Sequence, residues 1–181
     1  MKQTPEVLQS NIHFLEQGIE LLTSITDELY KKNNGAYHKS GIGVHFRHII
    51  EHYFSLINSE YSGIINYDLR KRDLRLENDR LFMIELLQEV IEALKKLADS
   101  PKLLQNHVEI VCNEGNDSEN SLISSSSIVR ELQFLISHTV HHYALIGLIL
   151  KTMGYIPDED FGVAPSTLKH KKLSNTVERV S

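Results

Sequence analysis

Residues 127–154, SIVRELQFLISHTVHHYALIGLILKTMG, are the stretch that decides the fold. Apolar residues recur in it at steps of three and four, a spacing typical of one face of an α-helix. Ser127 is a favoured capping residue at a helix N-terminus, and Gly154 is a favoured residue just after a helix end. We therefore predict one long helix over residues 127–153.

The same spacing predicts three earlier helices, over about residues 5–32, 41–58 and 79–99. Pro5 suits the first position of a helix, and Pro101 follows the end of the third of these segments. The connection between the second and third segments is polar and predicts no regular element.

Two further segments lack the helical spacing. Between residues 101 and 126 an alternating stretch, a turn-rich stretch and a serine run predict a crossover with a small hairpin. Residues 155–181 contain two prolines and end in polar and basic residues, so we expect an extended tail. Four helices of about 20 residues with one longer crossover predict an all-α four-helix bundle, as one domain over residues 1–181.

The composition excludes several classes of protein. The 181 residues are 41% hydrophobic and 24% charged, as in globular domains. Nineteen Lys and Arg against 24 Asp and Glu give a net charge of −5, which disfavours a nucleic-acid partner. The single Cys112 suits a reducing compartment, and no leader or run of apolar residues long enough for a membrane span is visible. We expect a cytoplasmic protein with no membrane partner.

Histidine is the unusual residue, because the chain has ten. Six of them lie in two of the predicted helices: His45, His48 and His52 in the second, and His138, His141 and His142 in the last. The first three fall within about 60° of one another around the helix axis and form a stripe. His138 and His142 are four residues apart, so their side chains lie one turn apart on the core-facing side, whereas His141 points toward an edge.

The grouping of these histidines favours a metal site. A single imidazole on an apolar face is more often structural, but facing groups of stacked imidazoles without a metal would leave donors or acceptors unpaired. Three neutral imidazoles and an open position match catalytic zinc sites, although nickel, copper and iron also accept imidazole. Neither HExxH nor ExxH occurs, which argues against a zincin protease and a carboxylate-bridged di-iron bundle.

Two motifs carry a resemblance to a known family. Residues 40–52, SGIGVHFRHIIEH, together with residues 137–146, SHTVHHYALI, resemble the DinB-like (YfiT-type) superfamily of metal-dependent hydrolases. Its members are four-helix bundles with one metal-binding histidine on the second helix and an HxxxH pair on the fourth. The resemblance implies His48, His138 and His142 as the metal ligands.

The resemblance also implies a range of chemistry. Active members of the superfamily include thiol-dependent transferases and an isomerase, so we expect one divalent metal ion, zinc or nickel, that activates water or a low-molecular-weight thiol toward a small-molecule substrate. His45, one turn before His48, is the alternative ligand. His52, His45 and His141 are expected to orient the ligands or to carry protons. The glutamine that the family has after the last ligand is not matched here, since Tyr143 and Ala144 follow.

A second set of candidate residues lies after the second predicted helix. Residues 66–72, NYDLRKR, could supply an anion clamp made by Tyr67, Asp68 and Arg70, since arginine binds carboxylates and phosphates through two parallel hydrogen bonds. The alternative is a solvated connection whose charges cancel. For the whole chain two further alternatives stay open: a non-catalytic interaction module, such as a homodimer with structural histidines, and a metal-based sensor of a small molecule.

Overall fold

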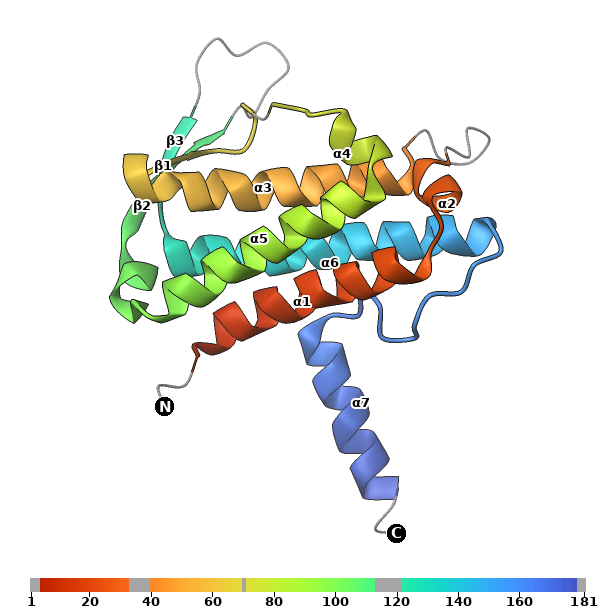
Figure 1. The fold of residues 1–181 in the computed structure, drawn as a ribbon. Coiled ribbons are helices and arrows are strands. Elements are labelled where there is room, and N and C mark those ends of the chain that lie inside the picture. Colours follow the sequence, from red (N-terminus) through yellow and green to blue (C-terminus); the bar gives the residue numbers. More distant parts are fainter. Residues whose placement is uncertain (1–3, 33–39, 70, 113–121, 179–181) are drawn as a thin grey trace.

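The computed structural model describes residues 4–32, 40–69, 71–112 and 122–178, and this part of the chain is mostly helical with a small three-stranded sheet (Figure 1). The four longest helices are α1 (Glu6–Ser24), α3 (Ile42–Ser62), α5 (Arg80–Ala98) and α6 (Ile128–Thr152). Both α1 and α3 pack against α5 and α6. The apolar faces that the spacing predicts therefore meet in one core, where Phe46, Tyr53 and Tyr143 are fully buried.

The first predicted helix is wrong in its length. It ends at Ser24, and a separate short helix, α2 (Asp27–Lys31), follows. Ile25 has extended backbone dihedral angles, and the Thr26 hydroxyl accepts a hydrogen bond from the backbone N–H of Leu29, which caps α2. The Thr26 cap thus starts α2 as a separate helix, although the apolar spacing of α1 continues through this segment.

The assignment to the purely all-α class is also wrong, because the chain forms a sheet of strand order β1-β2-β3. Its strands are β1 (Ile64–Asn66), β2 (His107–Cys112) and β3 (Leu122–Ser127). β2 and β3 are antiparallel, which confirms the predicted hairpin, and β1 pairs in parallel with β2. The turn-rich residues 113–121 lie outside the described residues.

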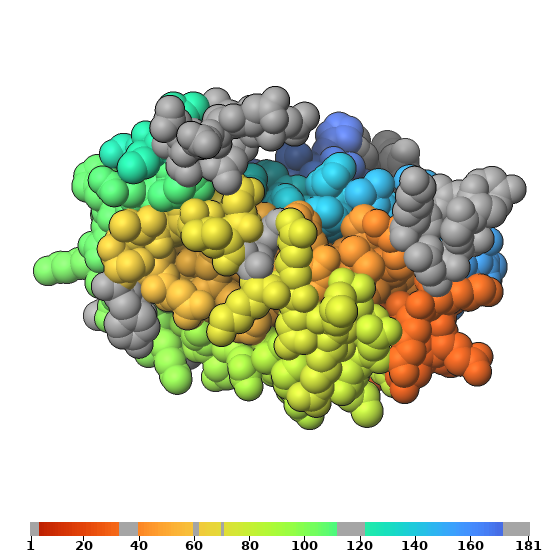
Figure 2. Space-filling view, turned by 90° about the horizontal axis from the view of Figure 1, so that it is seen from above, coloured from red at the N-terminus to blue at the C-terminus, as the bar shows by residue number. Residues whose placement is uncertain are grey.

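The connection between α3 and α5 contains more structure than its polar composition predicts. Gly63, in the left-handed region at φ 69°, ends α3, and β1 begins at the next residue. Before α5 lies a short helix, α4 (Arg75–Asn78), and a Cβ added to Gly43 on α3 would lie 2.2 Å from the Glu77 carbonyl oxygen. Glycine therefore permits α4 to rest on α3. Seen from above, the segment after α3 covers part of that helix (Figure 2).

The predicted extended tail is wrong as well. Phe161 is buried against Tyr143, with ring centroids 4.6 Å apart, and a further helix, α7 (Pro165–Glu178), then projects away from the four long helices (Figure 1). Pro165 stands at the first position of α7, where proline is favoured, rather than acting as a helix breaker. Among the described helices, none has the length and apolar character to cross a lipid bilayer.

Candidate metal centre

The two histidine windows face each other across the contact between α3 and α6. His48 lies on α3, and His138 and His142 lie one turn apart on α6. Both helices turn their apolar stripes to the same core, so residues at the margin of each stripe meet their counterparts on the other helix. The helical period that builds the core thereby also brings the imidazoles together.

His48, His138 and His142 form a compact group. One ring nitrogen from each can be chosen so that all three lie within 4.8 Å of one another. The ring centroid of His48 lies 4.9 Å from that of His138 and 4.6 Å from that of His142, and the latter two centroids are 4.6 Å apart. None of the three residues is exposed. Within the described part of the chain, this is the group of three or more metal-ligating side chains that comes together.

The other three histidines of the two windows surround this group. The Nδ1 atoms of His45 and His142 are 2.9 Å apart, so one of them donates a hydrogen bond to the other. His52 packs its ring 4.4 Å from that of His48 and 4.3 Å from that of His138. His141 is exposed and contacts the ring of His142 at 5.2 Å.

One hydrogen bond defines the tautomer of His52. Its Nδ1 lies 2.7 Å from the backbone carbonyl oxygen of His48, one turn earlier on α3. A carbonyl oxygen only accepts, so this nitrogen carries a proton and donates. In the neutral ring the lone pair is then on Nε2.

The residues of the predicted anion clamp have different surroundings. Tyr67 is buried, its ring stacks on that of His52 at 5.0 Å, and its hydroxyl donates to Glu131 Oε2 at 2.9 Å. Asp68 is exposed, and its backbone N–H donates to the Asn66 side chain. Arg70 lies outside the described residues. The clamp as a unit of three residues stays a prediction.

Sequence reasoning missed two residues beside the histidines. Glu131 is buried on α6 and accepts hydrogen bonds from Tyr67 and Ser126, and Phe134 stacks on His138 with centroids 5.4 Å apart. Glu131 stands seven residues before His138, two helical turns away on the same face. An acidic residue at that spacing from an HxxxH pair is the signal that could have identified it.

An ion-pair cluster joins α3 to the short helix α4. Arg47 donates to Glu51 at 2.9 Å and to Glu77 at 2.7 Å. Side-chain exposure of the three residues is between 7% and 21%, so these pairs are screened less than surface pairs. Arg47 therefore ties α3, next to His48, to the short helix α4.

A buried polar cluster lies between the helices near Thr139, the residue after His138. The Tyr53 hydroxyl donates to Asn11 Oδ1 at 2.8 Å and lies 3.4 Å from the Thr139 hydroxyl. The Asn11 side chain donates in turn to the Leu132 carbonyl oxygen. Complete burial raises the pKa of Tyr53 well above its ordinary value, so the phenol stays neutral and acts as a donor.

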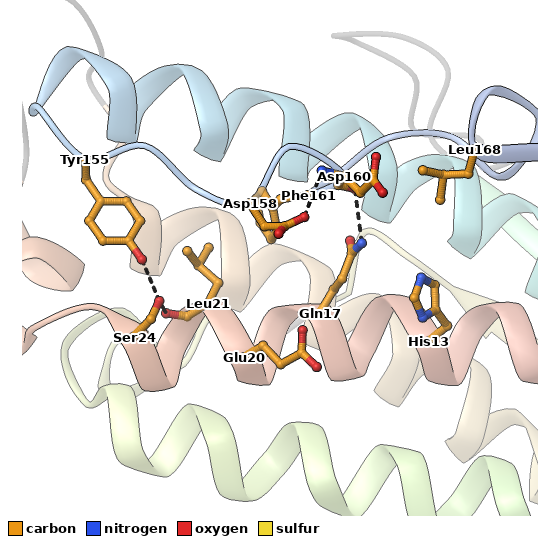
Figure 3. A pocket seen from close by; sticks show the side chains of 10 residues that line it. All are labelled: His13, Gln17, Glu20, Leu21, Ser24, Tyr155, Asp158, Asp160, Phe161 and Leu168. Carbon is orange, nitrogen blue, oxygen red and sulfur yellow. Dashed lines mark hydrogen bonds between the residues drawn. The ribbon is translucent and has the colours of Figure 1, made fainter. Parts of the chain in front are cut away.

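A cavity of about 550 Å³ lies elsewhere on the molecule, between α1 and the segment that follows α6 (Figure 3). Its lining includes His13, Glu20 and Asp158, and none of the six clustered histidines. Gln17 spans it, donating to the Asp160 carbonyl oxygen and accepting from the Gly162 N–H. The cavity is therefore separate from the candidate metal centre.

The chain was compared with known proteins and with protein-family models. No protein-family model matches the chain. The chain is similar to FK506-binding protein 5 of Rhizopus delemar, with 31% identity over 170 residues. The matched stretch covers 91% of this chain and 38% of that protein, so the chain spans little more than a third of its relative's length.

Proposed function

We propose that the chain is a DinB-like metal-dependent enzyme that binds one divalent ion, zinc or nickel, through His48, His138 and His142. The observation that carries this proposal is the convergence of three imidazoles, from two helices, with ring nitrogens within 4.8 Å. The resemblance of the two histidine motifs to the DinB-like superfamily supports it. In the same proposal the four long helices are the bundle of that superfamily, as a single domain.

The geometry of the three residues fits such an ion. Zinc–nitrogen bonds of about 2.0 Å at tetrahedral angles place two ligand nitrogens about 3.3 Å apart. The three nitrogens lie within 4.8 Å of one another, so a small rotation of the rings suffices to reach that separation. Three protein ligands leave a fourth position, which is the arrangement of catalytic rather than structural zinc sites.

The metal would supply a Lewis acid that activates water or a low-molecular-weight thiol at neutral pH. The chain's own residues orient the ligands. His45 holds Nδ1 of His142 through the 2.9 Å hydrogen bond, and with the proton on His142 Nδ1 the lone pair for a metal lies on its Nε2. His52 and His141 contact the ligand rings and are proposed to carry protons to and from the small-molecule substrate.

Metal content tests the first half of this proposal. Protein purified without a nickel column should contain about one divalent ion per chain, as expected for a site with three protein ligands and one open position. The double variant His138→Ala, His142→Ala should lose it. The matched control is His13→Ala, which removes an exposed histidine from α1, outside the cluster. Equal metal content in the wild type and the double variant would exclude the site.

Thiol binding tests the second half. Cobalt(II) in place of the native ion should develop a sulfur-to-metal charge-transfer band when glutathione is added, if the open position takes a thiolate. No band, together with hydrolysis of an ester or amide panel by the zinc form, would favour activation of water. Tight binding of a small molecule without turnover would instead support the sensor alternative.

The named relative favours a second candidate, binding of FK506 by this chain. The 31% identity extends over 91% of the chain, but the match covers only 38% of the relative, whose name can describe the part outside the match. Titration with FK506 tests this candidate. The chain has seven tyrosines and no tryptophan, so binding can be followed through its tyrosine fluorescence. The metal proposal expects no response.

A further inference from the structure

A buried carboxylate bonds to Tyr67, whose ring stacks on His52, and has no assigned role. Glu131 is 6% exposed and stands in the first turn of α6. Its Oε2 accepts the Tyr67 hydroxyl at 2.9 Å, and its Oε1 accepts the Ser126 hydroxyl at 2.5 Å. Both donors are neutral hydroxyl groups. Burying such a group is costly, and carboxylates kept inside a protein often serve a site.

The carboxylate fixes the ring of Tyr67. The hydroxyl has one proton, and its hydrogen bond to Glu131 holds the phenol at its distal end. The ring contacts Phe134 at 5.4 Å and lies nearly parallel to His52, with centroids 5.0 Å apart and an interplanar angle of 19°. Tyr67 thus covers one face of the imidazole.

The imidazole of His52 lies between Tyr67 and two of the three proposed ligands. Its centroid is 4.4 Å from that of His48 and 4.3 Å from that of His138, closer than the ligand rings are to each other. Even so, His52 does not belong to the group whose nitrogens converge within 4.8 Å. Its Nδ1–H donates to the His48 carbonyl oxygen, and the Tyr67 ring restricts rotation of the imidazole.

We propose that Tyr67 and Glu131 are positioning residues that hold His52 out of the metal's coordination sphere. Without them the His52 ring could move toward the ion and offer Nε2, which carries the lone pair while Nδ1 donates to the carbonyl, as a fourth imidazole ligand. Four protein ligands make a closed, structural type of zinc site, whereas three leave the open position that water or a thiol needs. The Glu131–Tyr67 pair therefore keeps the site accessible. This inference rests on the proposed function, because it requires a metal at His48, His138 and His142.

Cobalt(II)-loaded protein and azide, a small anion that binds open metal positions, provide the test. The wild type should bind azide, seen as a change in the cobalt d–d spectrum. Tyr67→Leu should keep its cobalt and lose azide affinity by about tenfold or more, in line with other residues that support metal ligands. The double variant Tyr67→Leu, His52→Ala should recover azide binding, because it lacks the imidazole that closes the site. Glu131→Gln should also lower the azide affinity, as Tyr67→Leu does.

The matched control is Tyr155→Leu, the same substitution at a tyrosine whose hydroxyl bonds to Ser24, away from the histidines. It should leave the cobalt spectrum and azide affinity unchanged. Unaltered azide affinity in Tyr67→Leu overturns the inference, and so does a loss that His52→Ala fails to restore, since that loss would come from general disruption. A wild type that binds no cobalt overturns the proposed function itself, and a wild type that binds cobalt but not azide overturns only the open position.

Discussion

Asp79 shows how one side chain shapes the segment before α5. Its backbone N–H bonds to the Arg75 carbonyl oxygen at the end of α4, while its carboxylate accepts the backbone N–H of Phe82 and caps α5. That backbone hydrogen bond, followed by the hydrogen bond and charge of Arg75, lowers the pKa of the Asp79 carboxyl below its ordinary value. The group therefore stabilises the fold above the pKa that it has in the unfolded chain, and this contribution is lost as the pH falls through the folded value.

Replacing Asp79 should reveal this pH dependence. Asp79→Ala should lower the urea midpoint at pH 7, and the difference from the wild type should shrink as the pH falls below about 4, where an unfolded aspartate protonates. Asp99→Ala, at the other end of the same helix, is the control: helix carbonyls disfavour a carboxylate there, so its removal should not reduce stability. A difference for Asp79→Ala that persists unchanged at pH 3 would contradict the role assigned to the charge.

The buried hydroxyl of Tyr53 gives a second expectation for a single residue. Tyr53→Phe removes the donor to Asn11, whose side-chain oxygen then stays buried, so the free energy of unfolding should fall by about 1–3 kcal/mol. Tyr155→Phe removes an exposed hydrogen bond to Ser24 and should change it by less than about 0.5 kcal/mol. Urea denaturation of the three proteins measures both effects, and equal losses would show that burial is not the cause.

Among the elements, α3 and α4 depend on close approach at Gly43. A Cβ there would lie 2.2 Å from the Glu77 carbonyl oxygen, so one helix or the other must move in Gly43→Ala, and the pair between Arg47 and Glu77 would be disturbed. We expect a loss of about 1–3 kcal/mol in the free energy of unfolding, typical of overpacking.

Gly147 on α6 supplies the matched substitution. A Cβ added to it meets no described atom within 4 Å, and alanine favours helix over glycine by up to about 1 kcal/mol. Gly147→Ala should therefore raise the thermal midpoint while Gly43→Ala lowers it. A change of the same sign in both variants would mean that helix propensity, not contact with α4, decides the outcome.

The bounds of helices whose apolar spacing continues over many residues could be predicted closely. The segment predicted over residues 127–153 forms α6 over Ile128–Thr152, and the segment predicted over residues 79–99 forms α5 over Arg80–Ala98. β1 could not be predicted, because three residues are too few to show a two-residue period and their pairing with β2 is a tertiary contact. The break after Ser24 was hidden because the apolar spacing runs through it.

Similar limits apply to the candidate site. Spacing alone places His138 and His142 on one face, and it indicates a stripe on α3. It does not reveal that Tyr67 lies against His52. That contact depends on the path of the chain after α3, where β1 directly precedes Tyr67. Spacing places Glu131 on the same face as His138, but it does not reveal the partners of that carboxylate, Tyr67 and Ser126, which lie on other elements.

For the whole molecule, a metal bound across α3 and α6 should stabilise the fold. Because the unfolded chain cannot hold three ligands in place, free zinc at a hundredfold excess over its dissociation constant should add about 2.7 kcal/mol to the free energy of unfolding. Differential scanning calorimetry of the wild type with zinc and with a chelator measures this shift. His138→Ala, His142→Ala should show none, and His13→Ala should match the wild type.

The hydrogen bond between His45 and His142 joins residues 97 positions apart in the chain. Contacts with so large a separation form only after a long loop has closed, whereas the turns of α3 and α6 can form locally. If the histidines meet after the rate-limiting step of folding, stabilising them lengthens the lifetime of the native protein without speeding its formation. An ion held there would lower the unfolding rate, and its loss would shorten the time for which the chain stays folded.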